Sequence, residues 1–371
     1  MVILMLVLGL VVLTAGAELL VRGSSRLAMA MGISPLVVGL TVVAYGTSAP
    51  ELVVSVQSSL IGQPDVAIGN VLGSNIFNVL FVLGLSAMIV PLRVSQQLIR
   101  FDVPLMVGLS FLVAVLALDG SIGRLDGLLL VGGMVSYSVL AIVTSRREQA
   151  GIQAEYEAEF GIGKQVQSRG QTVVNLLLVA AGLGLLVLGS QWFVDSAIAI
   201  ARQLGVSELV IGLTIVAAGT SMPELATSIM AAIRGERDIA VGNAVGSNIF
   251  NILGVLGVSS VVSADGVRVS AAAFQMDIPV MIAVAVACLP VFFVGHIISR
   301  WNGVMFFAFY CAYTASFVIA ETFPNLQRTF AFVMLGIVVP LTVITLLIGV
   351  VRSVRQGRNP EPLNENLSAS A

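Results

Sequence analysis

The chain has 371 residues, of which 57% are hydrophobic and only 10% are charged. Soluble domains carry about 25% charged residues, so the composition excludes an ordinary soluble domain and indicates a protein that crosses a lipid bilayer several times. The net charge of −2 and the lack of a basic run give no reason to expect nucleic acid as a partner.

Hydrophobic stretches long enough to span a bilayer follow one another along the chain. A spanning helix needs about 20 apolar residues, whereas the strands of a membrane barrel are short and alternating. We therefore predict an all-α polytopic membrane protein. Eleven stretches qualify as spans: 2–21, 34–60, 68–91, 102–119, 124–144, 172–194, 207–233, 241–263, 273–295, 301–320 and 329–351.

The second stretch contains the polar sequence GTSAPE, which ends at Glu51. A charged side chain near the centre of a bilayer costs at least about 2.5 kcal/mol, so residues of this kind are usually functional. Thr47 lies four residues before Glu51 and shares its helix face, with Ser48 beside it. The alternative, a neutral hydrogen-bonded carboxylic acid, does not account for the neighbouring hydroxyl groups.

Pro50 is expected to break this helix. It has no amide proton, so the carbonyl of Gly46 loses its helical partner, and Pro223 is expected to free the carbonyl of Gly219 in the same way. Broken helices that free main-chain carbonyls inside the membrane are a means by which transporters bind hard cations. A simple proline kink would explain the bend but not the adjacent Thr, Ser and Glu.

The third stretch contains GNVLGSNIFN at 69–78. Asn70, Ser74 and Asn78 are spaced four apart and form one polar stripe on a helix, whereas Asn75 lies about 100° away and is expected to be structural. Ser and Asn also join membrane helices by hydrogen bonds. The stripe is therefore compatible with a ligand role and with helix packing.

The second half of the sequence repeats these motifs at a shift of 173 residues. Gly39–Ser55 matches Gly212–Ser228 at 12 of 17 positions, and 69–78 matches 242–251 at 8 of 10. The repeat provides a second set of candidate residues. Its members are Thr220, Ser221, Glu224, Asn243, Ser247 and Asn251.

Each half contains five predicted spans, an odd number, so the second half is expected to insert upside down relative to the first. This is the inverted-repeat plan of secondary transporters. A charged and polar linker is expected between the halves, and an additional helix and a disordered tail after them. The predicted segments are 1–144 (first repeat), 145–171 (cytoplasmic linker), 172–320 (second repeat), 321–355 (additional helix) and 356–371 (tail).

The distribution of Lys and Arg predicts the orientation, since cytoplasmic loops are enriched in these residues. With the N-terminus outside, fourteen fall on the cytoplasmic side and four on the outer side. We therefore expect a multi-pass protein of the plasma or inner membrane, with its N-terminus outside and its C-terminus in the cytoplasm. The additional helix has no functional assignment. We expect this helix to lie at the periphery of the bundle or to form a dimer contact, so a homo-oligomer is compatible with the sequence.

The candidate ligands are all oxygen atoms. Oxygen sites select hard cations such as Ca²⁺, Na⁺, K⁺ or Mg²⁺, and Ca²⁺ takes about six to eight oxygens in flexible geometry. Two carboxylates carry a charge of −2, which one Ca²⁺ or two Na⁺ would neutralise. Competition of the two ions for one such site is antiport in physical terms.

GTSAPE, GTSMPE and the paired GNxxGSNIFN segments resemble the alpha repeats of the sodium/calcium exchanger family, within the cation/calcium exchanger superfamily. The resemblance covers both halves. It implies ten core helices, four central cation sites, no cofactor, and exchange of Na⁺ for Ca²⁺, usually three for one. It also implies that the motif-free helix pair at 1–21 and 172–194 slides over the core.

Carried over by position, the resemblance implies a ligand set in each half. The implied side-chain ligands are Thr47, Ser48, Glu51, Ser74 and Asn78, together with Thr220, Ser221, Glu224, Ser247 and Asn251. Main-chain carbonyls are also used in the family. The implied ones are those of Ala44, Thr47, Ala217 and Thr220.

Two details indicate which branch of the superfamily the chain resembles. Proton/calcium exchangers show a GNxxEH-type motif where this chain has GTSxPE, which favours Na⁺ coupling. Potassium-dependent members carry Asp at the position of Asn251, so the amide argues against K⁺ dependence and leaves the stoichiometry open. With no large calcium-sensing domain, the chain resembles a prokaryotic member.

Three other functions compete with Na⁺/Ca²⁺ exchange. A Ca²⁺/H⁺ antiporter would use the same two glutamates to take up protons. A cation channel fits less well, because inverted repeats around a midplane carboxylate pair suit a carrier. An enzyme is not expected, since no nucleophile–base pair or nucleotide loop is visible.

Overall fold

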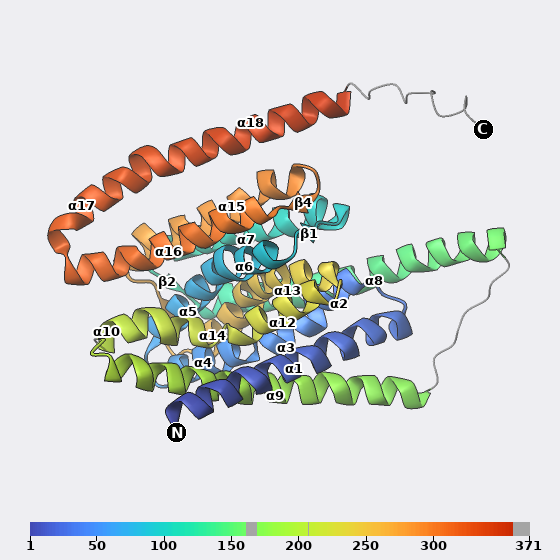
Figure 1. Cartoon of the computed structure of the whole chain (residues 1–371), viewed down its shortest axis with the longest axis horizontal. Helices are drawn as coiled ribbons and strands as arrows, with labels where there is room; N and C mark the ends of the chain where they lie inside the picture. Colours follow the sequence, from blue (N-terminus) through green and yellow to red (C-terminus); the bar gives the residue numbers. More distant parts are fainter. Residues whose placement is uncertain (161–168, 207, 359–371) are drawn as a thin grey trace.

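The computed structural model describes residues 1–160, 169–206 and 208–358, and in these ranges the chain is almost entirely helical (Figure 1). Nine of the described helices are long and apolar enough to span a membrane, or ten when a bent pair counts as one. The expected stretch 207–233 is divided into shorter pieces, of which Met222–Ile233 is the longest. The all-helical membrane architecture predicted from the sequence is confirmed.

The first half contains the predicted spans in order, several of them interrupted. Its helices are α1 (Val2–Met31), α2 (Pro35–Val38), η1 (Gly39–Val43), α3 (Ala44–Thr47), α4 (Ala49–Leu60), α5 (Pro64–Phe77), η2 (Asn78–Leu83), α6 (Gly84–Ile89), η3 (Leu98–Asp102), α7 (Val103–Leu116), η4 (Ala117–Asp119) and α8 (Arg124–Phe160). Helix α8 continues into the segment expected as a linker, and residues 161–168 of that segment lie outside the described residues.

The second half follows the same order. Its helices are α9 (Arg169–Gln203), α10 (Glu208–Ile211), η5 (Gly212–Val216), α11 (Ala217–Gly219), α12 (Met222–Ile233), α13 (Arg237–Phe250), η6 (Asn251–Leu256), α14 (Gly257–Val262), η7 (Ala273–Asp277), α15 (Ile278–Phe293) and α16 (Arg300–Thr322). The π-helical segments η1, η2 and η3 recur as η5, η6 and η7, so the repeat seen in the sequence is also a repeat of backbone conformation. Such π-helical turns are frequent at functional sites.

The two spans that carry the GNxxGSNIFN motifs form the centre of the bundle. Of their most apolar windows, 72% is buried in Asp65–Ile89 and 83% in Arg237–Val262, more than in any other described span. Their small and polar residues allow close packing against the broken helices of both halves. The core of the protein therefore lies around the polar motifs rather than away from them.

Two short strand pairs join the loops of one half to those of the other. Strand β1 (Leu92–Arg93) pairs antiparallel with β4 (Ile297–Ile298), and β2 (Ser121–Ile122) pairs antiparallel with β3 (Val267–Arg268). Each pair combines one strand from each half. The loops at both ends of the bundle are thus linked across the repeat interface.

Helices α1 and α9 form a separate antiparallel pair along one side of the bundle (Figure 1). Glycines allow their backbones to touch: a Cβ at Gly16 would lie 2.8 Å from the amide nitrogen of Leu186, and one at Gly182 would lie 2.6 Å from that of Leu20. Close approach of this kind is how small residues hold membrane helices together.

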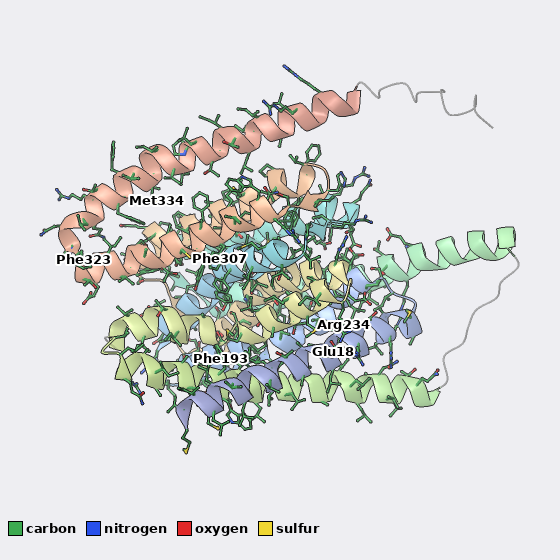
Figure 2. All side chains as sticks on the ribbon, in the orientation of Figure 1. Glu18, Phe193, Arg234, Phe307, Phe323 and Met334 are labelled. Carbon is green, nitrogen blue, oxygen red and sulfur yellow. The ribbon has the colours of Figure 1, made fainter. Side chains whose placement is uncertain are left out.

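The last helices, α17 (Pro324–Val333), η8 (Met334–Val338) and α18 (Val339–Arg358), run along the outside of the bundle (Figure 1). None of the apolar window of Pro324–Arg352 is buried within the described chain, and Phe323 and Met334 lie at its start, away from the core (Figure 2). The predicted additional helix therefore has a peripheral position. The predicted tail beyond Arg358 lies outside the described residues.

Candidate cation-binding site

The two GTSxPE motifs break their helices at equivalent serines. Ser48 has φ −84° and ψ 9°, and Ser221 has φ −91° and ψ 10°, which are values outside the α-helix. The halves of the first broken helix are bent by 46°. The proline that follows each serine occupies the first turn of the next helix, where its missing amide proton costs no hydrogen bond.

One carbonyl that was expected to be free has a partner. Pro223 leaves the carbonyl of Gly219 without an intrahelical donor, but the hydroxyl of Ser190 on α9 donates to this oxygen at 2.9 Å. The position equivalent to Ser190 in the first half is Ala17, which has no such group. The sequence motif could not reveal this partner, because Ser190 lies on a different helix.

The two motifs meet through reciprocal hydrogen bonds across the repeat interface. The hydroxyl of Ser48 donates to Oε1 of Glu224 at 2.7 Å, and the hydroxyl of Ser221 donates to Oε1 of Glu51 at 2.7 Å. All four side chains are fully buried. The convergence of the two glutamates expected from the inverted repeat is therefore present in the structure.

The threonines of the motifs also cross the interface. The hydroxyl of Thr47 donates to Oδ1 of Asn243 at 3.1 Å, and the hydroxyl of Thr220 donates to Oδ1 of Asn70 at 3.3 Å. The polar stripes of α5 and α13 thus reach the broken helix of the opposite half.

The same two asparagines hold the first turns of α4 and α12. Nδ2 of Asn70 donates to the main-chain oxygen of Glu51 at 3.1 Å and to Oγ of Ser55 at 2.9 Å. In the second half, Nδ2 of Asn243 donates in the same way to the main-chain oxygen of Glu224 at 3.2 Å and to Oγ of Ser228 at 2.9 Å. Since the amide oxygens and nitrogens are used in hydrogen bonds, Asn70 and Asn243 position the glutamates rather than offer free ligand atoms.

Five buried oxygen atoms of the predicted ligands have no hydrogen-bond partner among the described residues. They are Glu51 Oε2, Glu224 Oε2, Asn78 Oδ1, Asn251 Oδ1 and Ser247 Oγ. A buried polar atom without a partner is costly, and such atoms are rare in folded proteins. Oxygens of this kind are able to coordinate a cation.

The remaining predicted ligands differ in their surroundings. Oγ of Ser74 lies 3.1 Å from Oγ of Ser221 and 3.5 Å from Oε1 of Glu51. The carbonyl of Ala44 accepts a hydrogen bond from the amide of Ser48 at 3.0 Å, and its oxygen lies 3.3 Å from Oγ1 of Thr47. Ala217 is the first residue of α11. The roles of the Ala44 and Ala217 carbonyls stay predictions.

The donor set contains only hard oxygen atoms and two carboxylates. Among the described residues, no group of three or more His, Cys, Asp or Glu side chains is arranged so that it could hold a metal ion. The residues present fit Na⁺ or Ca²⁺, since both take oxygen ligands from carboxylates, amides, hydroxyls and carbonyls.

The helices that carry the GNxxGSNIFN motifs, α5 and α13, are packed differently in the two halves. A Cβ at Gly246 on α13 would lie 2.6 Å from Cα of Leu40, whereas one at the equivalent Gly73 on α5 would meet no described atom within 4 Å. Gly242 is packed in the same way, and its counterpart Gly69 is open. The first-half motif helix is therefore accessible on a face that is closed in the second half.

The chain matches the family model of the sodium/calcium exchanger proteins over residues 1–143 and 174–319. It is 32% identical to a sodium/calcium exchanger of Methanosarcina acetivorans over 339 residues, which cover 84% of this chain and 96% of that protein. It is 36% identical to the inner membrane protein YrbG of Escherichia coli over 283 residues, 76% of this chain and 86% of that protein.

Solved structures with the same fold belong to the sodium-calcium exchanger NCX_Mj. A structure soaked with 10 mM Na⁺ and no Ca²⁺ superimposes with a TM-score of 0.71 and 31% identity, covering 87% of this chain and all of that one. A structure soaked without either ion gives a TM-score of 0.72 and 33% identity, covering 85% of this chain and 99% of that one.

Proposed function

The chain belongs to the sodium/calcium exchanger protein family, and we propose that it exchanges Na⁺ for Ca²⁺ across the membrane by alternating access. Membership of this family makes it a multi-pass ion exchanger rather than an enzyme, with cations as its substrates and no cofactor. We also propose which ion drives the exchange, which residues bind the cations and which way the chain is oriented in the membrane.

The observation that carries the proposal is the reciprocal pairing of Ser48 with Glu224 and of Ser221 with Glu51 in a fully buried site. Each carboxylate uses Oε1 in this pairing and keeps Oε2 without a partner among the described residues. We assign these oxygens to cation binding. The assigned side-chain ligands are Thr47, Ser48, Glu51, Ser74, Asn78, Thr220, Ser221, Glu224, Ser247 and Asn251, with the carbonyls of Ala44 and Ala217 beside them.

Charge balance gives a physical basis for exchange. Two ionised carboxylates buried together need two positive charges, because an uncompensated buried charge is very costly. One Ca²⁺ or two Na⁺ supply them, whereas both together leave excess positive charge. Occupation by one ion therefore disfavours the other, as antiport through a shared site requires.

Ca²⁺/H⁺ exchange is the second candidate. The unpaired Oε2 atoms of Glu51 and Glu224 can hold protons as well as coordinate a cation, so protons can compete for the same groups. The two candidates share the site and the fold and differ only in the driving ion.

We place the protein in the plasma or inner membrane with its N-terminus outside and its C-terminus in the cytoplasm. The bias of Lys and Arg, fourteen against four, supports this orientation. The name of the Escherichia coli relative supports an inner membrane.

Calcium uptake into sodium-loaded proteoliposomes tests the coupling. Vesicles are diluted into sodium or choline buffer containing radioactive Ca²⁺, with and without a proton uncoupler. We expect uptake only in choline buffer and no effect of the uncoupler, because the outward Na⁺ gradient drives exchange. Uptake that ignores Na⁺ and follows a pH gradient would contradict Na⁺ coupling and favour the proton-coupled alternative.

A further inference from the structure

Four fully buried asparagines lie at the interface between α5–η2 and α13–η6. Asn78 and Asn251 are assigned above as ligands, whereas Asn75 and Asn248 are not. All four side chains are at most 2% exposed. The ends of a buried amide are not equivalent, since the oxygen can bind a cation and the NH₂ group repels one.

A chain of contacts fixes the orientation of Asn251. Nδ2 of Asn75 lies 3.5 Å from the sulfur of Met281, and Oδ1 of Asn75 accepts a hydrogen bond from Nδ2 of Asn251 at 3.1 Å. A thioether only accepts hydrogen bonds, so it selects the NH₂ end of Asn75. The oxygen of Asn75 then selects the NH₂ end of Asn251.

Oδ1 of Asn251 is consequently turned away from Asn75, and it is one of the buried oxygens without a partner in the described chain. We propose that Asn75 is a positioning residue that orients the amide of Asn251, so that the oxygen and not the NH₂ group faces the bound cation. This inference rests on the proposed function, since it takes Asn251 as a ligand.

The equivalent chain in the other half is incomplete. Nδ2 of Asn248 lies 3.4 Å from the sulfur of Met106, as expected from the repeat, and it also donates to the main-chain oxygen of Asn75 at 3.3 Å. However, Oδ1 of Asn248 and Nδ2 of Asn78 both lack a partner within the described residues. Asn78 is therefore not oriented in this way, and the two ligand asparagines differ although their sequences repeat.

This difference supplies a matched pair of variants. Leu is close to Asn in shape, so Asn75→Leu removes the acceptor that orients Asn251 while preserving volume. Without it, the NH₂ group of Asn251 can turn toward the carboxylates. We expect the Ca²⁺ dissociation constant of the purified full-length protein, measured by calorimetry, to rise about tenfold, as is common when a residue that orients a ligand is lost. Asn248→Leu is the matched control, because it removes a donor to the main chain of Asn75 but leaves the side-chain acceptor of Asn251 in place. We expect it to weaken Ca²⁺ binding clearly less than Asn75→Leu does.

Two further variants separate orientation from a general loss of packing. Met281→Leu keeps every asparagine but removes the acceptor that selects the NH₂ end of Asn75, and we expect Ca²⁺ binding to weaken about fivefold, the effect of one net hydrogen bond. Met106→Leu is its control and should not weaken binding. In Asn251→Asp the carboxylate has an oxygen at both ends, so adding Asn75→Leu should cause little further loss.

Thermal melting of each apo protein shows whether the variants fold. Equal weakening by Asn75→Leu and Asn248→Leu, or no weakening by Asn75→Leu and Met281→Leu, would overturn the role of Asn75. The same Asn75→Leu effect in the Asn251→Asp background would also overturn it. A wild-type protein that binds no Ca²⁺ would overturn the proposed function and this assignment with it.

Discussion

Glu51 and Glu224 occupy equivalent positions and have equivalent partners. Each accepts a hydrogen bond from the motif serine of the opposite half, and the main-chain oxygen of each is held by an asparagine of the same half. The carboxylates are thus positioned by both repeats. The Oε2 atom of each has no partner among the described residues, and under the proposed function this oxygen binds the cation.

Replacing either glutamate with glutamine tests this assignment. Glu51→Gln and Glu224→Gln keep the size and the acceptor oxygen of the side chain but remove one of the two negative charges. We expect Ca²⁺ transport in proteoliposomes to fall by about 100-fold or more, since charged ligands contribute more than neutral ones. The melting temperature of the apo protein should stay close to that of the wild type or rise. Near-normal exchange by either variant would contradict the assignment.

The sequence predicted which polar side chains lie together where the information lies within one helix. The spacing of Thr47, Ser48 and Glu51, and its repetition, identified groups that the structure brings together. Partners on other helices were missed, because they depend on packing that no local spacing encodes. Ser190 is such a partner, and Asn75 was expected to be structural without a link to Asn251. Ser55 and Ser228, which accept hydrogen bonds from Asn70 and Asn243, could have been recognised from the sequence, since they are the last matching residues of the 17-residue repeat.

The α1–α9 pair is held together differently from the rest of the bundle. Its two helices touch through glycines, whereas polar contacts attach the pair to the region of α12. The carboxylate of Glu18 on α1 pairs with Arg234 at 2.6 Å (Figure 2). It also pairs with Arg22 on the same helix. The hydroxyl of Ser25 donates to Glu236 at 2.6 Å. The two helices therefore pack tightly against each other, and polar side chains of α1 connect the pair to the core.

A glycine substitution on α9 tests the backbone contact. In Gly189→Ala the new Cβ would lie 2.5 Å from the amide nitrogen of Leu13, so α1 and α9 must separate. We expect a destabilisation of about 2 kcal/mol, typical of overpacking, seen as a lower melting temperature in detergent. Gly184→Ala on the same helix meets no described atom within 4 Å and should leave the melting temperature unchanged or raise it. Equal melting of the two variants would refute a glycine-mediated helix pair.

Hydrophobic stretches located the spanning helices but not their interruptions. The stretch 34–60 appears as one apolar run, yet it contains a π-helical segment and a break at Ser48. The proline signalled the break, whereas nothing in the composition of η1 signals its π-helical conformation. Helix α8 runs to Phe160 although residues after 144 are polar, because a helix outside the bilayer needs no apolar surface.

The two halves of the molecule are connected by strand pairs, but their motif helices are packed differently. The β1–β4 and β2–β3 pairs connect them at both ends, which disfavours a simple rocking of one half against the other. Equivalent glycines are nevertheless packed on α13 and open on α5. Inverted repeats in two different conformations are expected of an alternating-access carrier, since exchanging the conformations would open the opposite side.

Under the proposed function, Na⁺ and Ca²⁺ share one buried site between Glu51 and Glu224. Equilibrium binding of radioactive Ca²⁺ to the purified protein, at increasing NaCl and with matched KCl as the control, tests it most directly. We expect Na⁺ to displace Ca²⁺ with a steeper than first-order dependence, because at least two Na⁺ are needed to balance the two carboxylates. K⁺ should not displace Ca²⁺. Ca²⁺ binding that is unaffected by Na⁺, or that K⁺ weakens equally, would contradict a shared site.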